Sequence, residues 1–75
     1  MNQDETIATP KYKIGQRVKV FSWGGFDFGK IVDIKWIYHN RFEEWTWGYK
    51  VKYENRGSGL TLRYAPEWYL RNPEE

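Results

Sequence analysis

Apolar and polar residues alternate strictly along one stretch in the second half of the chain. From Trp45 to Tyr53 every odd position holds an aromatic residue or valine, and every even position holds a smaller or polar residue. Successive side chains of a β-strand point to opposite faces, so this period of two predicts a strand over residues 44–54. Residues 39–43 and 55–59 are rich in turn-forming types, which predicts a loop on each side of that strand.

The first half of the chain predicts two more strands. Residues 16–21 place Val18 and Val20 on one face and basic residues on the other, the pattern of a strand with one solvated side. Residues 29–39 are rich in β-branched and aromatic types but follow no helical period, which predicts a long, bent strand.

Glycine and proline separate the remaining segments. Residues 22–28 hold two adjacent glycines between aromatic residues and predict a flexible aromatic loop. Apolar residues alternate again over 60–64, which predicts a fourth strand. We expect residues 65–67 to interrupt the sheet because proline cannot donate to the ladder, and residues 68–71 to form a short last strand.

Five short strands in about 60 residues cannot form a stable single layer, because one aromatic face would stay in water. We therefore expect an all-β fold in which the sheet curls into a small barrel over residues 11–71, with flexible acidic tails at 1–10 and 72–75. The expected core consists of one or two tryptophans together with Val18, Val20, Ile31, Ile34, Tyr49, Val51, Leu60, Leu62 and Leu70.

Charge is divided between the middle and the ends of the chain. All twelve lysines and arginines lie between Lys11 and Arg71, against six acidic residues there, which gives that segment a net charge of +6. Such an excess favours an acidic partner, either nucleic acid or an acidic protein surface. We see neither a signal peptide nor a run of about 18 apolar residues, and therefore expect a cytoplasmic protein without membrane contact.

Three segments carry a resemblance to a known class of fold. The segment IGQRVKV at residues 14–20, followed by GKIVDI at 29–34, resembles the opening of Src-homology-3-like barrels, in particular their KOW and Tudor branches. The segment YAPEWYL at 64–70 is similar to the single 3₁₀ turn before the last strand of Src-homology-3 domains. This resemblance covers residues 12–71 and implies a five-stranded barrel with a short 3₁₀ turn before its last strand.

The resemblance implies several functions, because barrels of this kind serve as peptide adaptors, nucleic-acid binders, readers of methylated residues and accessory subunits. The chain lacks the A-L-Y-D-Y segment of the signalling branch and an acidic loop between the first two strands, which argues against binding of proline-rich peptides. Its loop at 22–28 is aromatic rather than basic, which differs from the KOW branch.

The sequence offers little material for catalysis. It has no cysteine and a single histidine, which excludes a thiolate metal site, a cysteine nucleophile and a site with several histidines. His39 lies in a predicted turn, away from Ser22 and Ser58, while Glu43 and Glu44 are neighbours that diverge if they lie in a strand. We therefore expect no enzyme activity, no cofactor and no metal.

Aromatic residues make up 20% of the chain, more than the inside of so small a barrel can hold. We expect the surplus rings to converge at one end of the barrel, where they could also close a second, minor core. The predicted function is a non-catalytic interaction module or accessory subunit that docks on a partner protein through this aromatic end. The predicted partner-binding residues are Trp23, Phe26, Phe28, Trp45, Trp47, Trp68 and Tyr69.

The alternative is a KOW- or Tudor-like domain that binds nucleic acid through basic residues and exposed rings. Its predicted contacts are Lys19, Lys30, Lys35, Lys50, Lys52 and Arg63. One continuous basic stripe beside the exposed rings would favour nucleic acid, whereas scattered charges would favour a partner protein. A cage for a methylated lysine or arginine would need three or four rings around one cation.

Overall fold

The computed structural model describes residues 9–22, 25–54 and 63–74. These residues form one antiparallel sheet in the order β4-β3-β2-β1-β5. The elements are β1 (Arg17–Ser22), β2 (Gly25–His39), β3 (Glu44–Tyr53), β4 (Ala65–Pro66), the 3₁₀ turn η2 (Glu67–Tyr69) and β5 (Leu70–Arg71). The prediction of an all-β fold with a 3₁₀ turn before the last strand is confirmed.

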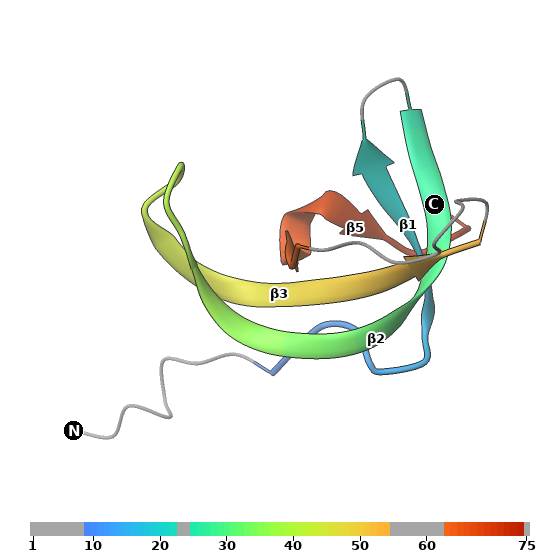
Figure 1. The fold of residues 1–75 in the computed structure, drawn as a ribbon, viewed down its shortest axis with the longest axis horizontal. Coiled ribbons are helices and arrows are strands. Elements are labelled where there is room, and N and C mark those ends of the chain that lie inside the picture. The colour runs from blue at the N-terminus through green and yellow to red at the C-terminus, as the bar shows by residue number, and fades with distance from the viewer. Residues whose placement is uncertain (1–8, 23–24, 55–62, 75) are drawn as a thin grey trace.

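Strand β2 belongs to both halves of the sheet. Residues 25–30 pair with β1, whereas residues 29–39 pair with β3. The register shifts between Ile31 and Asp33, so Val32 is an extra residue that bends the strand, as the sequence predicts. In Figure 1, β2 and β3 run side by side as a long curved pair of strands, and β5 lies on the concave side of this pair. Among the described residues no ladder joins β4 to β5, so the expected closure into a barrel is not seen.

The loop predicted at 22–28 needs correction at both ends, since Ser22 belongs to β1 and Gly25 begins β2. The aromatic segment predicted as a loop at 22–28 is strand from Gly25 onwards, because Phe26 pairs with Phe21 and Phe28 with Lys19 on β1. Cross-strand contacts of these rings favour continued pairing over a long loop. Strand β3 confirms the prediction over 44–54 to within one residue.

The C-terminal segment also differs from its predicted secondary structure. The sequence predicts that Ala65 and Pro66 interrupt the sheet, but they form β4 opposite Tyr49 and Gly48. Pro66 is compatible with pairing because β4 is an edge strand, where a missing N–H need not break the ladder. The predicted last strand at 68–71 begins only at Leu70, after η2. The strand predicted at 60–64 falls mostly outside the described residues, and so do Leu60 and Leu62.

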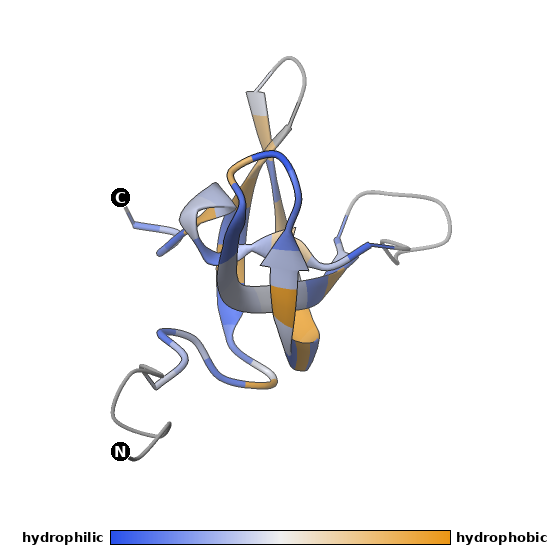
Figure 2. Ribbon diagram, turned by 90° about the vertical axis from the view of Figure 1, so that its left-hand side faces the viewer, coloured by the Kyte–Doolittle hydropathy of each residue, from blue (hydrophilic) through white to orange (hydrophobic). Residues whose placement is uncertain are grey.

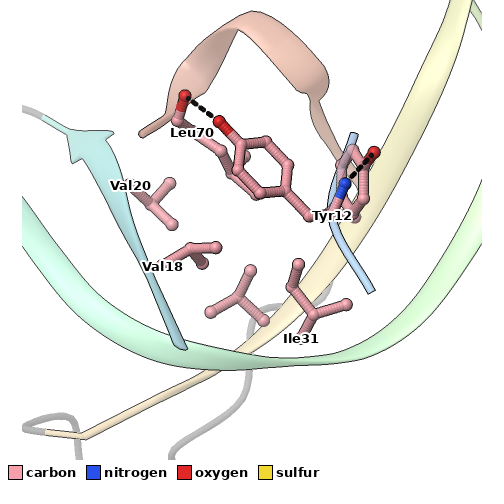
Figure 3. Packing of buried hydrophobic residues seen from close by; sticks show 7 residues of the cluster. Tyr12, Val18, Val20, Ile31 and Leu70 are labelled. Carbon is pink, nitrogen blue, oxygen red and sulfur yellow. Dashed lines mark hydrogen bonds between the residues drawn. The ribbon is translucent and has the colours of Figure 1, made fainter. Parts of the chain in front are cut away.

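The core lies on the concave face of the sheet (Figure 3). Its buried residues are Tyr12, Val18, Val20, Ile31, Tyr49, Val51 and Leu70, with Ile34, Trp47, Tyr53 and Ala65 packed against them. Figure 2 shows the corresponding alternation of hydrophobic and hydrophilic residues along the strands. Apart from Tyr12, every one of the seven buried residues is an expected core residue.

Tyr12 is the core residue that alternation does not reveal, since it precedes the first strand. Its ring meets that of Tyr49 edge to face, with a centroid distance of 5.5 Å, and its hydroxyl donates to the carbonyl oxygen of Leu70 at 3.1 Å (Figure 3). Tyr12 therefore connects β3 to β5 across the concave face, where the described strands make no ladder of their own.

The hydroxyl of Tyr49 anchors the segment before β1. It donates to Oε2 of Glu67 at 2.6 Å and accepts from the backbone N–H of Lys11 at 3.1 Å. Burial, and then the hydrogen bond to Glu67, raises the pKa of Tyr49 well above its ordinary value. The hydroxyl therefore stays protonated as a donor throughout the physiological pH range.

The outer face of the sheet is less solvated than the alternation predicts. Thr46 and Gly48 are buried although they point away from the core. A Cβ on Gly48 would lie 2.6 Å from Cδ1 of Ile37 and 2.8 Å from Cβ of Tyr64, so neighbouring side chains cover this part of β3. Lys19 is also only 8% exposed. Tertiary packing, rather than strand period, sets the exposure of these positions.

The Val51→Ala change tests the predicted register of β3. Val51 is fully buried, so we expect the free energy of unfolding to fall by about 1–3 kcal/mol through lost burial and an incompletely collapsed cavity. Lys52→Ala is the matched control, since Lys52 is exposed and its replacement should change stability by less than about 0.5 kcal/mol. Urea unfolding measures both. A larger loss for the lysine variant would contradict the observed register.

Candidate functional site

The predicted partner-binding aromatics that the structure describes do not all meet at one end of the molecule. Phe26 and Phe28 lie beside Phe21 on the outer face of β1 and β2. A second group forms on the β2–β3 hairpin, and a third joins that hairpin to η2. Trp23 lies outside the described residues. Phe26 and Phe28 are thus apart from the rings at the hairpin, because the two halves of the long β2 pair with different strands.

The first group is a row of three phenylalanines. The rings of Phe21 and Phe26 are 6.0 Å apart and those of Phe26 and Phe28 are 5.8 Å apart, both edge to face. Phe21 and Phe26 keep 44% and 47% of their surface exposed, although a sheet face turned to water usually carries polar side chains. This phenylalanine row is therefore a surface feature and not part of the core.

Each ring of the phenylalanine row has a basic side chain over it. Arg17 Cζ lies 4.5 Å from the centroid of Phe28, and Lys19 Nζ lies 4.5 Å from that of Phe26. On β5, Arg71 Cζ lies 5.1 Å from the centroid of Phe21. The negative face of an aromatic ring attracts a cation at these distances. Cations and rings are thus held together before any ligand arrives.

The basic surface continues from this row across β2 and β3. Lys30 faces Lys52 across the ladder, and both are exposed. Two like charges directly opposite each other destabilise a sheet, so the pair has no evident structural benefit. Further along, Lys50 and Lys35 place their Nζ atoms 5.1 and 5.7 Å from the ring centroid of Tyr64.

We use the name basic face for the phenylalanine row and the cations that share its side of the sheet. These cations are Arg17, Lys19, Lys30, Lys35, Lys50, Lys52 and Arg71. All seven come from β1, β2, β3 and β5. Strand alternation places them opposite the core residues of the same strands.

Within the described part of the chain, Glu54 and Asp33 contact residues of the basic face or the adjoining Tyr64. Glu54 accepts from Arg17 Nε at 2.5 Å, which lowers the pKa of Glu54 and raises that of Arg17. Asp33 accepts from the hydroxyl of Tyr64, which lowers the pKa of Asp33, an effect that Lys50 and Lys35 reinforce. Both carboxylates therefore stay ionised at neutral pH, and five cations remain in excess over them.

The predicted nucleic-acid contacts separate into three sets. Four of them, Lys30, Lys35, Lys50 and Lys52, lie on the basic face with at least part of their surface in water. Lys19 lies there too, but its burial leaves it to support Phe26 rather than to reach a ligand. Arg63 is not part of the basic face and lines a hollow together with His39 and Tyr69.

Sequence reasoning missed three residues of the basic face. Arg17, Phe21 and Arg71 are absent from the predicted contacts. Arg17 and Phe21 share the face of Lys19 by simple alternation, so the signal was present in the sequence. Arg71 could not be found in this way, because only the pairing of β5 with β1 brings it opposite Lys19.

The second aromatic group, which we name the hairpin cluster, consists of Trp36, Tyr38, Trp45 and Trp47. The ring of Trp36 lies 6.2 Å from Trp45, nearly parallel to it, and 5.0 Å from Trp47. Trp47 packs against the core, whereas Trp45 and Tyr38 are 58% and 46% exposed. The cluster therefore extends the core into solvent.

The third group lies where η2 meets the β2–β3 hairpin. The rings of His39, Phe42 and Trp68 contact one another at 5.2–5.5 Å. Two of these rings, Phe42 and Trp68, also line a shallow hollow together with Glu44. Tyr69, which follows Trp68, is exposed and lies beside Arg63.

Other chemistry is sparse in the described part of the chain. No group of three or more His, Asp or Glu side chains there could hold a metal ion. A hollow of about 430 Å³ near Lys11, Glu44 and Trp68 mixes both charges, and its Glu67 already accepts from Tyr49. None of the helical segments among these residues is long and apolar enough to span a membrane.

Comparison of the chain with protein-family models, with curated proteins and with solved structures found no match. The chemistry of its surface is therefore the basis for assigning a function.

Proposed function

We propose that this protein is a non-catalytic domain that binds nucleic acid through the basic face. The observation that carries the proposal is the position of six solvent-accessible cations on one side of four strands, beside exposed phenylalanine rings. A phosphate backbone is a line of closely spaced negative charges, and an elongated row of cations complements it better than scattered charge would.

We also propose that the complete domain is an Src-homology-3-like barrel of the KOW or Tudor kind. The strand order, the bend in β2 and the 3₁₀ turn before β5 support this assignment. Such a barrel would present the basic face on its convex side, since Val18, Val51 and the other core residues occupy the concave side.

A second candidate function is docking of a partner protein on the hairpin cluster. The exposure of Trp45 and Tyr38 favours it, because large aromatic side chains anchor many protein interfaces. The hairpin cluster offers no charge pattern that selects one kind of partner, so the basic face supports the more specific proposal.

The double change Lys30→Glu, Lys52→Glu tests the proposal. With a fluorescein-labelled oligonucleotide at ~50 mM salt, we expect affinity to fall at least about tenfold, because two attractive phosphate interactions become repulsive. The dependence of affinity on salt should also become less steep, since the variant neutralises two fewer phosphates. Fluorescence anisotropy measures both quantities.

The matched control is Lys13→Glu, Arg41→Glu. It changes the net charge equally, and both residues are exposed outside the strands of the basic face. Equal weakening by both double variants would mean that total charge alone drives binding. No binding of the unchanged protein at this low salt would end the nucleic-acid proposal and leave the hairpin cluster as the candidate, with Trp45→Ala as its probe.

A further inference from the structure

We infer that the basic face selects single-stranded nucleic acid and that Phe21 and Phe26 stack against its unpaired bases. This inference rests on the proposed function and specifies its ligand.

The position of the two rings supports the inference. Phe21 and Phe26 are cross-strand partners in the β1–β2 pair, and each exposes nearly half of its surface. Their edge-to-face contact fixes the rings relative to each other, so little rotamer freedom remains to be lost on binding. The two rings stand nearly perpendicular, at 89°, so each presents its own exposed surface to a separate base.

The cations beside the rings provide the second argument. Arg71 lies over Phe21, and Lys19 lies over Phe26. In a single strand each base is linked through its sugar to a phosphate, so a ring with a cation next to it can meet both the base and the phosphate of one nucleotide. Arg71 is partly exposed and can take the phosphate, whereas the buried Lys19 holds Phe26 in place.

A duplex cannot use this arrangement. Its bases are stacked on one another inside the helix, and the sheet meets only phosphates and groove edges. The exposed rings would then contribute little, and binding would depend on Lys30, Lys52 and the other cations alone. The rings therefore predict a preference for unpaired strands that the cations by themselves would not produce.

The Phe26→Leu change tests the inference because leucine keeps an apolar side chain but has no aromatic face. We expect affinity for a ~15-nucleotide oligothymidine to fall about tenfold, and affinity for a hairpin duplex of equal phosphate number to stay within about twofold. Phe21→Leu should behave in the same way, so the inference can still be tested if one of the two variants is unstable. Thermal unfolding of each variant checks the fold.

The matched control is Phe42→Leu, since Phe42 is an exposed phenylalanine in the β2–β3 turn, outside the basic face. It should leave both affinities unchanged. If the unchanged protein binds duplex as tightly as single strand, or if Phe26→Leu weakens both equally, the inference is wrong while the proposed function stands. If neither nucleic acid binds, the proposed function itself fails. If the protein bound vesicles that contain phosphatidylserine but no nucleic acid, the proposed function and the inference would both be wrong, and the basic face would be a membrane-binding surface.

Discussion

Replacement of Tyr12 by alanine is expected to lower the free energy of unfolding by about 3–5 kcal/mol, the usual cost of removing a fully buried aromatic ring. Tyr12 is 2% exposed and touches both halves of the sheet, through the ring of Tyr49 and the carbonyl of Leu70. Its loss leaves a cavity at the point where β3 and β5 face each other. Since small domains have only about 5–15 kcal/mol of stability, this loss is a large fraction of the total.

Tyr12→Phe separates the ring from its hydroxyl. It keeps the contact with Tyr49 and loses only the hydrogen bond to Leu70, so the expected cost is about 1 kcal/mol. Tyr38→Ala serves as a control for an exposed tyrosine and should cost less than Tyr12→Ala. Urea unfolding followed by tryptophan fluorescence ranks the three. If Tyr12→Ala cost no more than Tyr38→Ala, the segment before β1 would not belong to the core.

Gly29→Ala is expected to destabilise the protein by about 3 kcal/mol, the upper part of the range for an overpacked site. A Cβ at this position would lie 2.5 Å from the carbonyl oxygen of Lys52 and 2.6 Å from Cγ1 of Val51. The oxygen belongs to the backbone of β3, directly beside the pair that Gly29 makes with Tyr53. Relief of the clash must therefore move one strand relative to the other.

Gly48→Ala provides the comparison. Its Cβ would meet the end of the flexible Ile37 side chain at 2.6 Å, which rotation can partly relieve, although Cβ of Tyr64 lies at 2.8 Å. We therefore expect a smaller loss than at Gly29. Thermal unfolding of both variants measures the difference. Because alanine lowers the entropy of the unfolded chain, a stabilised Gly29→Ala variant would show that the two strands are less closely packed than described.

Gly29 also affects the geometry of the basic face. It lies in the part of β2 that pairs with both β1 and β3, next to Phe28 and Lys30. Close approach of the strands at this glycine places the phenylalanine row beside Lys30 and its cross-strand partner Lys52. The core on the concave side thus determines how the cations are spaced on the other side. Any variant of the basic face should accordingly be compared at matched stability.

The candidate site was only partly predictable. Regular alternation assigns Lys50 and Lys52 to the polar face of β3. Lys30 and Lys35 lie five positions apart in β2 and share that face only because Val32 is an extra residue between them. The convergence of the aromatic residues could not be predicted correctly. Phe26 and Trp45 are both on strands of one sheet, yet the bend at Val32 and the pairing of β2 with two partners separate them.

By itself the sequence determined the strands and most of the core, because both depend on local alternation. A period of two is enough to identify β3 and the faces of Val18, Val20 and Val51. The tertiary structure alone decided the place of Tyr12, the burial of Lys19 and Thr46, and the position of Arg71 opposite Lys19. Each of these depends on contacts between residues far apart in the chain, whose geometry follows from the register and twist of the whole sheet and leaves no periodic signal.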